Sequence, residues 1–239
     1  MRMFFPVFLA LMLSFPFSSF SRSDPPQVSS DSILDTSSIL PPPPAFDSII
    51  MENDRAQYEY GLTLRNTERG KQAKLDANLK NCHELFSEAF GYPINAEKTP
   101  EIYKLLKISF QQIDKGSARV AKRKYMRVRP FTLYNTNTCY AEDEEVLRHT
   151  GSYPSGHTAT SWGYALLLAE INPGRREEIL KRGYEMGQSR VICGYHWQSD
   201  VDAARVSSAG AVAVLHANPE FQKQMEKAKM EFATLNIQK

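Results

Sequence analysis

From residue 188 to residue 202 the chain reads Gln-Ser-Arg-Val-Ile-Cys-Gly-Tyr-His-Trp-Gln-Ser-Asp-Val-Asp. His196 and Asp200 are four positions apart, about one helical turn. A carboxylate on one imidazole nitrogen fixes the tautomer and leaves the other nitrogen free to attack. Arg190, whose planar guanidinium suits phosphate oxygens, lies six positions before His196, so one straight helix would not align them. Gly194 offers a break that would; the alternative is an ordinary His–Asp pair on a helix surface.

A second motif, Gly-Ser-Tyr-Pro-Ser-Gly-His, ends at His157. Pro154 and Gly156 predict a turn, and the helical stretch that follows would offer free backbone N–H groups to an anion. The Ser155 hydroxyl adds a donor, and His157 could pass a proton to a leaving oxygen at the edge of such a site. A serine-hydrolase elbow is excluded, because neither glycine of Gly-x-Ser-x-Gly is present. Taken alone, a histidine at a helix start is more often structural.

The third motif is the basic stretch Lys-Arg-Lys-Tyr-Met-Arg-Val-Arg-Pro, which starts at Lys122. Lys122 and Arg129 are seven positions apart, so a helix would place them about 20° apart on one face. Two cations on one face can hold one anion. We expect Arg123, Lys124 and Arg127 to form a solvated basic face.

Outward from these motifs the pattern is helical, because helix formers dominate and no long alternating strand pattern occurs. We therefore predict a single all-α domain, a helical bundle, over residues 47–239. Thr99 and Pro100 provide a helix start, and Asn172 and Pro173 separate two helices. The predicted helices run over about 47–65, 68–90, 98–112, 114–127, 156–171, 174–192, 199–216 and 218–234.

The first residues have the layout of a cleaved secretory signal peptide, which we predict to cover residues 1–21. Arg2 gives a positive start, and an apolar run to Phe17 is followed by small residues. The alternative is a membrane anchor, but the run is shorter than the ~20 residues needed to span a bilayer. Pro6 and Pro16 also interrupt it.

Residues 22–46 are rich in Ser, Pro and Asp, which predicts an extended arm on the surface rather than a helix. The arm ends in a run of four prolines, and a protein partner that recognises this run is a less favoured interpretation. The run consists of Pro41, Pro42, Pro43 and Pro44.

Charge and cysteine content exclude two classes of function. The formal net charge is +2, whereas a general nucleic-acid binder would be clearly basic. The three cysteines, Cys82, Cys139 and Cys193, include no Cys-x-x-Cys pair that would indicate zinc. Export permits one disulfide and leaves one thiol over, but spacing does not decide which two residues pair.

Taken together, the three motifs resemble the full signature of the type 2 phosphatidic acid phosphatase superfamily, which also includes vanadium haloperoxidases. They are Lys-x6-Arg-Pro from Lys122, Pro-Ser-Gly-His from Pro154 and Ser-Arg-x5-His-x3-Asp from Ser189. The four prolines and the two longer motifs are similar to those of class A bacterial non-specific acid phosphatases, over about residues 38–235. The resemblance implies an all-α, periplasmic, homo-oligomeric enzyme with a broad substrate range. A bacterial apyrase, which takes ATP through ADP to AMP, belongs to the same group.

The resemblance also implies a role for each motif residue. His196 attacks phosphorus and becomes a phosphohistidine, Asp200 orients it, and His157 protonates the leaving oxygen and then activates water. The non-bridging phosphate oxygens would be held by Lys122, Arg129, Ser155, Gly156 and Arg190. Because three cations already face the phosphate, the scheme predicts no metal and no cofactor. We expect an acidic to neutral pH optimum and inhibition by vanadate.

Other functions remain as alternatives. Apyrase activity would use the same site, and no residue separates it from phosphatase activity. A haloperoxidase would be a much longer chain, and the lipid phosphatases of this superfamily embed their site among membrane helices. From another class, an anion-binding or adhesive surface protein would bind without turnover, which leaves the His157, His196 and Asp200 spacing as coincidence. The remaining histidines, His83, His149 and His216, match no motif and are expected to be structural or surface residues.

Overall fold

The computed structural model describes residues 34–79, 81–114 and 118–237. The predicted signal peptide and residues 22–33 of the predicted arm lie outside these ranges. Within them the chain forms helices and no strand, which confirms the all-α prediction. None of these helices is long and apolar enough to cross a membrane. The α-helices are α1 (Ile49–Leu64), α2 (Glu68–Leu75), α3 (Ser87–Phe90), α4 (Pro100–Asp114), α5 (Val120–Tyr125), α6 (Pro130–Leu133), α7 (Glu144–Arg148), α8 (Gly156–Ile171), α9 (Arg176–Ile192), α10 (Gln198–His216) and α11 (Pro219–Ile237).

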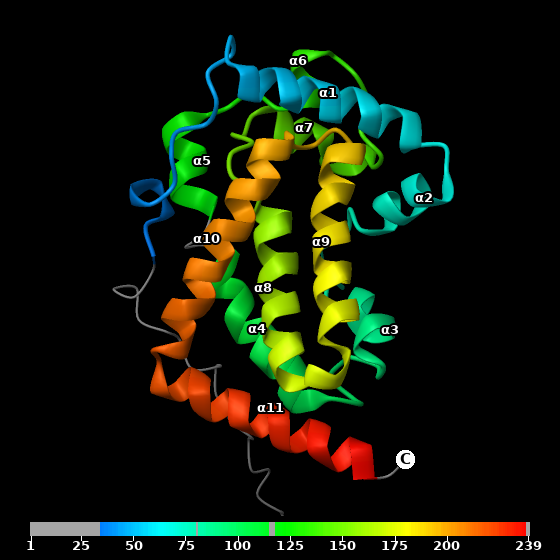
Figure 1. The fold of residues 1–239 in the computed structure, drawn as a ribbon, viewed down its shortest axis with the longest axis vertical. Coiled ribbons are helices and arrows are strands. Elements are labelled where there is room, and N and C mark those ends of the chain that lie inside the picture. The colour runs from blue at the N-terminus through cyan, green and yellow to red at the C-terminus, as the bar shows by residue number, and fades with distance from the viewer. Residues whose placement is uncertain (1–33, 80, 115–117, 238–239) are drawn as a thin grey trace, which may run out of the picture.

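Helix α8 lies at the centre of the bundle, between α9, α10 and α4 (Figure 1). It is rich in small and apolar residues, and most of its side chains are buried. Small residues let its neighbours approach closely: a Cβ added at Gly183 of α9 would lie 2.4 Å from the Cβ of Ala165. The main core lies between these helices and α11, and Ile102, Leu105, Leu106, Leu167, Leu168 and Phe221 are among its most buried members.

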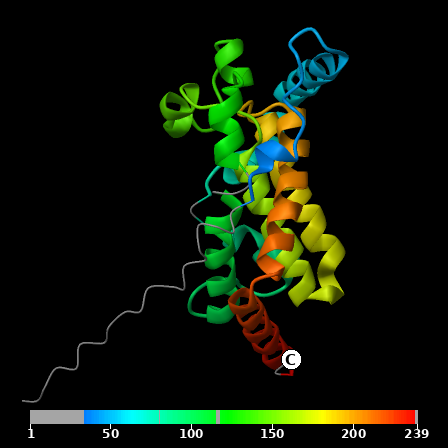
Figure 2. The ribbon, with the colours of Figure 1, turned by 90° about the vertical axis from the view of Figure 1, so that its left-hand side faces the viewer.

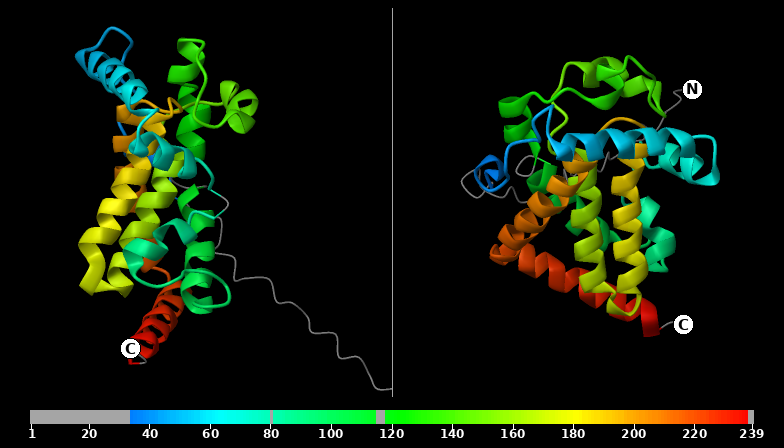
Figure 3. Two further views of the ribbon diagram at one scale, coloured as in Figure 1. Left: turned by 90° about the vertical axis from the view of Figure 1, so that its right-hand side faces the viewer. Right: turned by 45° about the horizontal axis from the view of Figure 1, so that its top comes forward.

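The two ends of the bundle are closed differently. Helix α1 crosses the ends of α9 and α10, as the right-hand view of Figure 3 shows. Helix α11 crosses the opposite end against α4 (Figure 2). There the Glu231 carboxylate accepts hydrogen bonds from the backbone N–H groups of Glu101 and Ile102 at 3.1 and 2.9 Å. A carboxylate on free N–H groups at a helix start is favourable, so α11 caps α4.

Six of the predicted helices match observed helices closely, but the prediction of one helix over residues 68–90 is wrong. Helix α2 ends at Leu75, and the chain turns before η3 (Glu84–Phe86) and α3. The turn begins at Asp76, whose carboxylate is buried and pairs with Arg182 of α9. This tertiary contact overrides the local helix propensity. The segment between the helices predicted over 114–127 and 156–171 also contains the short helices α6 and α7.

The described part of the predicted arm lies against α5 and α10. It starts with a short 3-10 helix, η2 (Thr36–Ser38), and has no regular structure from Leu40 to Pro44. The Pro41 carbonyl accepts a hydrogen bond of 2.9 Å from the hydroxyl of Tyr153, a residue of the second motif. The proline run therefore begins next to the turn that starts α8.

Candidate active site

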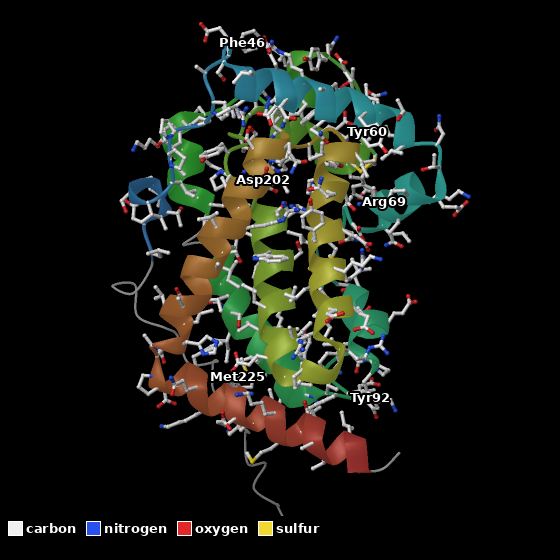
Figure 4. All side chains as sticks on the ribbon, in the orientation of Figure 1. Phe46, Tyr60, Arg69, Tyr92, Asp202 and Met225 are labelled. Carbon is white, nitrogen blue, oxygen red and sulfur yellow. A yellow bond between two sulfur atoms is a disulfide. The ribbon has the colours of Figure 1, made fainter. Side chains whose placement is uncertain are left out.

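The residues singled out in the sequence meet at the end of the bundle that α1 covers. Figure 4 shows Asp202 in the half of α10 nearer α1, while Met225 lies on α11 at the other end. The two ends differ in chemistry: the α11 end is the apolar core, and the α1 end holds buried charges such as Asp54, Arg190 and Asp200. Buried charges are costly unless they are paired, so their concentration at one end indicates a functional site.

A sharp turn after α9 brings Arg190 and His196 together. Helix α9 ends at Ile192, and Gly194 adopts φ of +77°, a conformation that favours glycine. The backbone N–H groups of Tyr195 and His196 then donate to the Arg190 carbonyl at 3.0 and 3.4 Å. The predicted break at Gly194 is thus present in the structure.

The two ring nitrogens of His196 face different groups. Nδ1 lies 3.4 Å from Oδ2 of Asp200, and Nε2 lies 3.1 Å from a terminal nitrogen of Arg129. A guanidinium only donates hydrogen bonds, so Nε2 must present its lone pair to Arg129 and Nδ1 must carry the hydrogen. The geometry therefore selects the tautomer in which Nδ1 carries the hydrogen and Nε2 carries the lone pair.

His196 is not part of a helix, contrary to the simple helical-turn interpretation of its spacing to Asp200. Helix α10 starts at Gln198, and Trp197 is its N-cap. Asp200 lies in the first turn of α10, where Oδ2 also accepts a hydrogen bond of 2.9 Å from the Trp197 backbone N–H. The pair forms because Asp200 caps the start of its own helix and so faces back toward His196.

Lys122 and Arg129 converge, but not as two positions on one helix face. Helix α5 ends at Tyr125 and Met126 has φ of +43°, so the predicted helix over 114–127 stops early. Arg129 is extended because it precedes Pro130, a position where the helical conformation is disfavoured. The Lys122 ammonium and the Arg129 guanidinium nevertheless both donate to the Gly151 carbonyl at 3.0 Å.

The second motif forms the predicted turn and helix start. Ser155 is the N-cap of α8 and its hydroxyl oxygen accepts bonds of 3.3 and 2.9 Å from the N–H and hydroxyl of Thr158. The Ser155 hydroxyl hydrogen remains available to another acceptor. Gly156 opens α8 beside Lys122, because a Cβ there would lie 3.9 Å from the Lys122 side chain. The N-terminus of a 16-residue helix is a favourable place for an anion.

Backbone hydrogen bonds join this turn to the other motifs. The Ser155 N–H donates to the Asp200 carbonyl at 3.0 Å, and the Ser152 N–H donates to the Arg127 carbonyl at 2.9 Å. All three motifs are therefore held in one unit whose geometry does not depend on side chains alone.

His157 is held by a backbone carbonyl. Its Nε2 lies 3.0 Å from the Ala77 oxygen, so Nε2 carries a hydrogen and donates it. The other nitrogen, Nδ1, is then the one that can exchange a proton with a bound molecule.

Arg190 has buried donors without an acceptor among the described residues. Its Nε and one terminal nitrogen make no hydrogen bond there, and its guanidinium lies 4.0 Å from the ring centre of Tyr195. Buried donors normally have partners, and the oxygens of an anion would supply them.

Burial and mutual repulsion shift the pKa values of this cluster. Burial and the charge of Arg190 lower the pKa of His157 well below its ordinary value. Burial and the charge of Arg129 do the same to the pKa of His196. Burial is also the main reason why the pKa of Arg129 and that of Arg190 fall to about 10, and why the Lys122 pKa falls well below its usual range. Closely spaced cations that lower one another's pKa values are typical of a site for an anion.

Arg127 is not part of a solvated basic face, and that expectation is wrong. Its side chain is 8% exposed and pairs with Asp54 at 2.7 Å and with Asp200 at 2.6 Å. In an extended segment residues two apart share a face, so Arg127 and Arg129 both point inward while Val128 between them is exposed. The proline at position 130 was the signal in the sequence for this extended geometry.

Asp76 and Ser189 form a second polar group behind the site that sequence reasoning missed. The Ser189 hydroxyl donates to the Asp76 carboxylate at 2.5 Å, and Arg182 pairs with the same carboxylate. Arg69, labelled in Figure 4, donates to the Ser189 hydroxyl at 3.0 Å. Ser189 precedes Arg190, so this group fixes the end of α9. It also fixes Ala77, whose carbonyl holds His157.

The structure shows which two of the three cysteines pair. Cys139 and Cys193 form a disulfide, whereas Cys82 is a buried free thiol. Burial raises the pKa of Cys82 to about 12, so it is inert as a nucleophile. The disulfide anchors the loop that leads into His196.

The other histidines lie in ordinary environments. His83 is buried with its ring against Tyr103, while His149 and His216 pair with glutamates, Glu145 and Glu170.

Comparison with known proteins gives the same family throughout. A family model described as the PAP2 superfamily matches residues 112–223, which contain all three motifs. The chain is 58% identical to a non-specific acid phosphatase of Providencia stuartii over 204 residues, 84% of this chain and 82% of that one.

Two further relatives are more distant. A non-specific acid phosphatase of Salmonella typhimurium is 45% identical over 82% of this chain and 80% of its own length. An acid phosphatase of Zymomonas mobilis is 35% identical over 80% of this chain and 73% of its own length. The chain belongs to the PAP2 superfamily and, within it, to the class A bacterial non-specific acid phosphatases, so it is a phosphoric monoester hydrolase.

Proposed function

We propose that this acid phosphatase works through a phosphohistidine on Nε2 of His196, without a metal ion. The observation that carries the proposal is the pair of contacts on the His196 ring, with a carboxylate at Nδ1 and a guanidinium at Nε2. The first orients the ring and balances the positive charge that it gains on attack. The second places Arg129, which we propose binds a phosphate oxygen, beside the attacking nitrogen.

In the first step the Nε2 lone pair attacks phosphorus and the bond from phosphorus to the leaving oxygen breaks. Lys122, Arg129 and Arg190 hold the non-bridging oxygens together with the Ser155 hydroxyl and the Gly156 N–H. Donors fixed in advance favour the charge-rich transition state over the ground state. His157 gives the Nδ1 proton to the leaving oxygen, so an alcohol departs rather than an alkoxide.

In the second step water attacks the phosphohistidine. Nδ1 of His157, now unprotonated, takes a proton from that water, and the bond between phosphorus and Nε2 breaks with its electron pair returning to nitrogen. The products are the alcohol and inorganic phosphate, and both histidines return to their starting states.

The proposal accounts for activity on the acidic side of neutrality. The pKa of His157 is lowered by burial and by the charge of Arg190. A bound phosphate places negative charge among these cations, which raises the His157 pKa again. Substrate binding thus favours the protonated acid that the first step needs.

We propose broad phosphatase activity, nucleotides included, in preference to apyrase activity, because each relative described above is named as an acid phosphatase. We also propose export to the periplasm. Oligomerisation with further copies of the chain and a partner for the four prolines stay predictions.

The test is phosphate release by the purified mature chain in EDTA from p-nitrophenyl phosphate, AMP, ADP and ATP. We expect hydrolysis without metal, cleavage of AMP, and loss of kcat on the order of 10⁵-fold or more in His196→Ala. His149→Ala is the matched control, because His149 is exposed and pairs with an exposed glutamate, Glu145, at 3.4 Å. Cleavage of ATP and ADP with AMP spared would indicate apyrase activity. Binding without turnover, or full activity in His196→Ala, would refute the proposal.

A further inference from the structure

A buried ion network lies on the Nδ1 side of His196, whereas Arg129 lies at Nε2. It consists of Asp54, Arg127 and Asp200, together with Ser199. Both carboxylates are fully buried, and the Arg127 side chain is 8% exposed. A buried charge cluster is a poor source of stability, since its desolvation cost offsets most of the attraction. Stability alone therefore does not account for this network, which indicates a role in the function of the site.

The two oxygens of Asp200 have different partners. Oδ2 faces Nδ1 of His196 at 3.4 Å and accepts the Trp197 N–H at 2.9 Å. Oδ1 accepts a hydrogen bond of 2.6 Å from Arg127. Because the two oxygens lie in one plane, Arg127 fixes the rotation of the carboxylate and so the direction in which Oδ2 points at His196.

Asp54 of α1, which belongs to none of the three motifs, is the second carboxylate of the network. One oxygen accepts the Ser199 backbone N–H at 2.8 Å, and the other accepts bonds from the Ser199 hydroxyl at 2.5 Å and from Arg127 at 2.7 Å. Ser199 directly precedes Asp200 in the first turn of α10. Asp54 therefore holds the start of α10 and the Arg127 guanidinium in one fixed arrangement.

The net charge of the network is opposite to the charge of the ring in the proposed phosphohistidine intermediate. Two carboxylates and one guanidinium leave one excess negative charge beside His196. A histidine phosphorylated on Nε2 and protonated on Nδ1 carries a positive ring charge, which that excess balances. If Asp54 were absent, Arg127 would neutralise Asp200 and leave nothing to oppose the charge on the ring.

We propose that Arg127 and Asp54 are positioning residues for phosphoryl transfer, acting on His196 through Asp200. Among the residues that the structure describes, neither Arg127 nor Asp54 makes a hydrogen bond to the side chains proposed to bind phosphate. The proposal rests on the phosphohistidine mechanism and adds to it a link from α1 to the nucleophile.

A double-mutant cycle tests this link. We compare wild type, Arg127→Met, Asp200→Asn and the double variant, with p-nitrophenyl phosphate as substrate. Arg127→Met is expected to lower kcat by about 10- to 100-fold with KM changed less than about threefold, as for outer partners that orient a functional group. In the Asp200→Asn background the same change is expected to cost less than about twofold, because the group it acts through has gone.

The matched control is Arg123→Met, which removes an exposed arginine from the same basic stretch and should leave kcat unchanged. An equal loss from Arg127→Met in both backgrounds would show a general structural effect and overturn the proposal. Wild-type kcat in Arg127→Met would overturn it too.

Arg127→Met removes the cation that pairs with two buried carboxylates, so thermal melting accompanies every assay. If that variant does not fold, Asp54→Asn keeps the size of the side chain and the pairing of Arg127 with Asp200. It is expected to slow formation of the phosphohistidine by about tenfold. Wild-type kinetics in a folded Asp54→Asn would overturn the charge-balance argument and with it the role of Asp54.

Rapid quenching of the wild type separates this proposal from the one on which it rests. Absence of an acid-labile phosphohistidine in the wild type would refute the mechanism itself. Its presence, together with unchanged Arg127→Met kinetics, would refute only the positioning role.

Discussion

His196 and His157 make an informative pair, because the same side chain lies in two buried, cation-rich surroundings whose hydrogen-bond partners differ. Burial and nearby cations lower both pKa values. The nitrogen that holds His196 in place faces the carboxylate of Asp200, whereas the nitrogen that holds His157 faces the neutral carbonyl of Ala77. A carboxylate stabilises a positive ring, and a carbonyl fixes the tautomer with less charge stabilisation. The partner, rather than the histidine, therefore distinguishes the proposed nucleophile from the proposed proton donor.

The two histidines are also anchored differently. The chain that enters His196 is fixed by the disulfide at Cys193 and by a hydrogen bond of 3.1 Å from the Phe131 N–H to the Gly194 carbonyl. His157 lies in the first turn of α8, behind the Ser155 cap. The proposed in-line attack by His196 requires a rigidly held side chain, and this anchoring supplies it.

Among tests of this comparison, the largest effect is expected from Asp200→Asn, which replaces the carboxylate beside His196 by a neutral amide. The asparagine amide can adopt two orientations. In the first, its oxygen accepts the Trp197 N–H and its NH₂ group faces Arg127. In the second, the NH₂ group faces Nδ1 of His196. Both arrangements lose the negative charge, and the second favours the wrong tautomer. We expect kcat to fall on the order of 10³- to 10⁴-fold, measured by steady-state assay and by quenching for phosphohistidine.

Asp202→Asn is the control for that variant, because Asp202 is an exposed carboxylate on the same helix that pairs with Arg205. It should retain wild-type kcat. Equal losses in the two variants would mean that α10 is merely sensitive to charge, and the comparison of the two histidines would lose its basis.

An intermediate effect is expected from His157→Ala, and its size should depend on the leaving group. An alkyl phosphate needs a proton on its leaving oxygen, so we expect the first turnover to slow by about 10²- to 10³-fold. p-Nitrophenolate leaves without a proton, so its release in the first turnover should slow by about tenfold or less. Stopped-flow and quenched-flow measurements of the first turnover check this, and an equal loss for both substrates would contradict the role of His157.

Sequence patterns predicted most of the fold because the long helices are locally encoded. The helices predicted over 156–171, 174–192 and 199–216 correspond to α8, α9 and α10 within a few residues. The helix predicted over 68–90 was wrong, because its break depends on the pairing of Asp76 with Arg182, 106 residues away in the sequence. Local propensity carries no information about such a contact.

The residues that the motifs single out do lie together in the structure, but partly for a different geometric reason than the one predicted. Lys122 and Arg129 converge through the extended segment before Pro130 and not on one helix face. The same assumption of a continuous helix led to the prediction that Arg127 is solvated. Asp54 lies in an unremarkable helical stretch, and only the fold shows that it reaches α10.

The smallest expected effect concerns stability and follows from the shared feature of the two histidines. Both have pKa values well below the ordinary 6.5 in the folded chain, so below about pH 6.5 the unfolded chain binds protons that the folded chain does not. Stability is therefore expected to fall as the pH drops from 7 toward 5. His157→Ala should flatten this slope, whereas His149→Ala should leave it as in the wild type. Inorganic phosphate at 100 times its Kd should restore about 2.7 kcal/mol. Melting temperatures at each pH check this, and identical slopes in the wild type and His157→Ala would show that His157 is not held neutral by the fold.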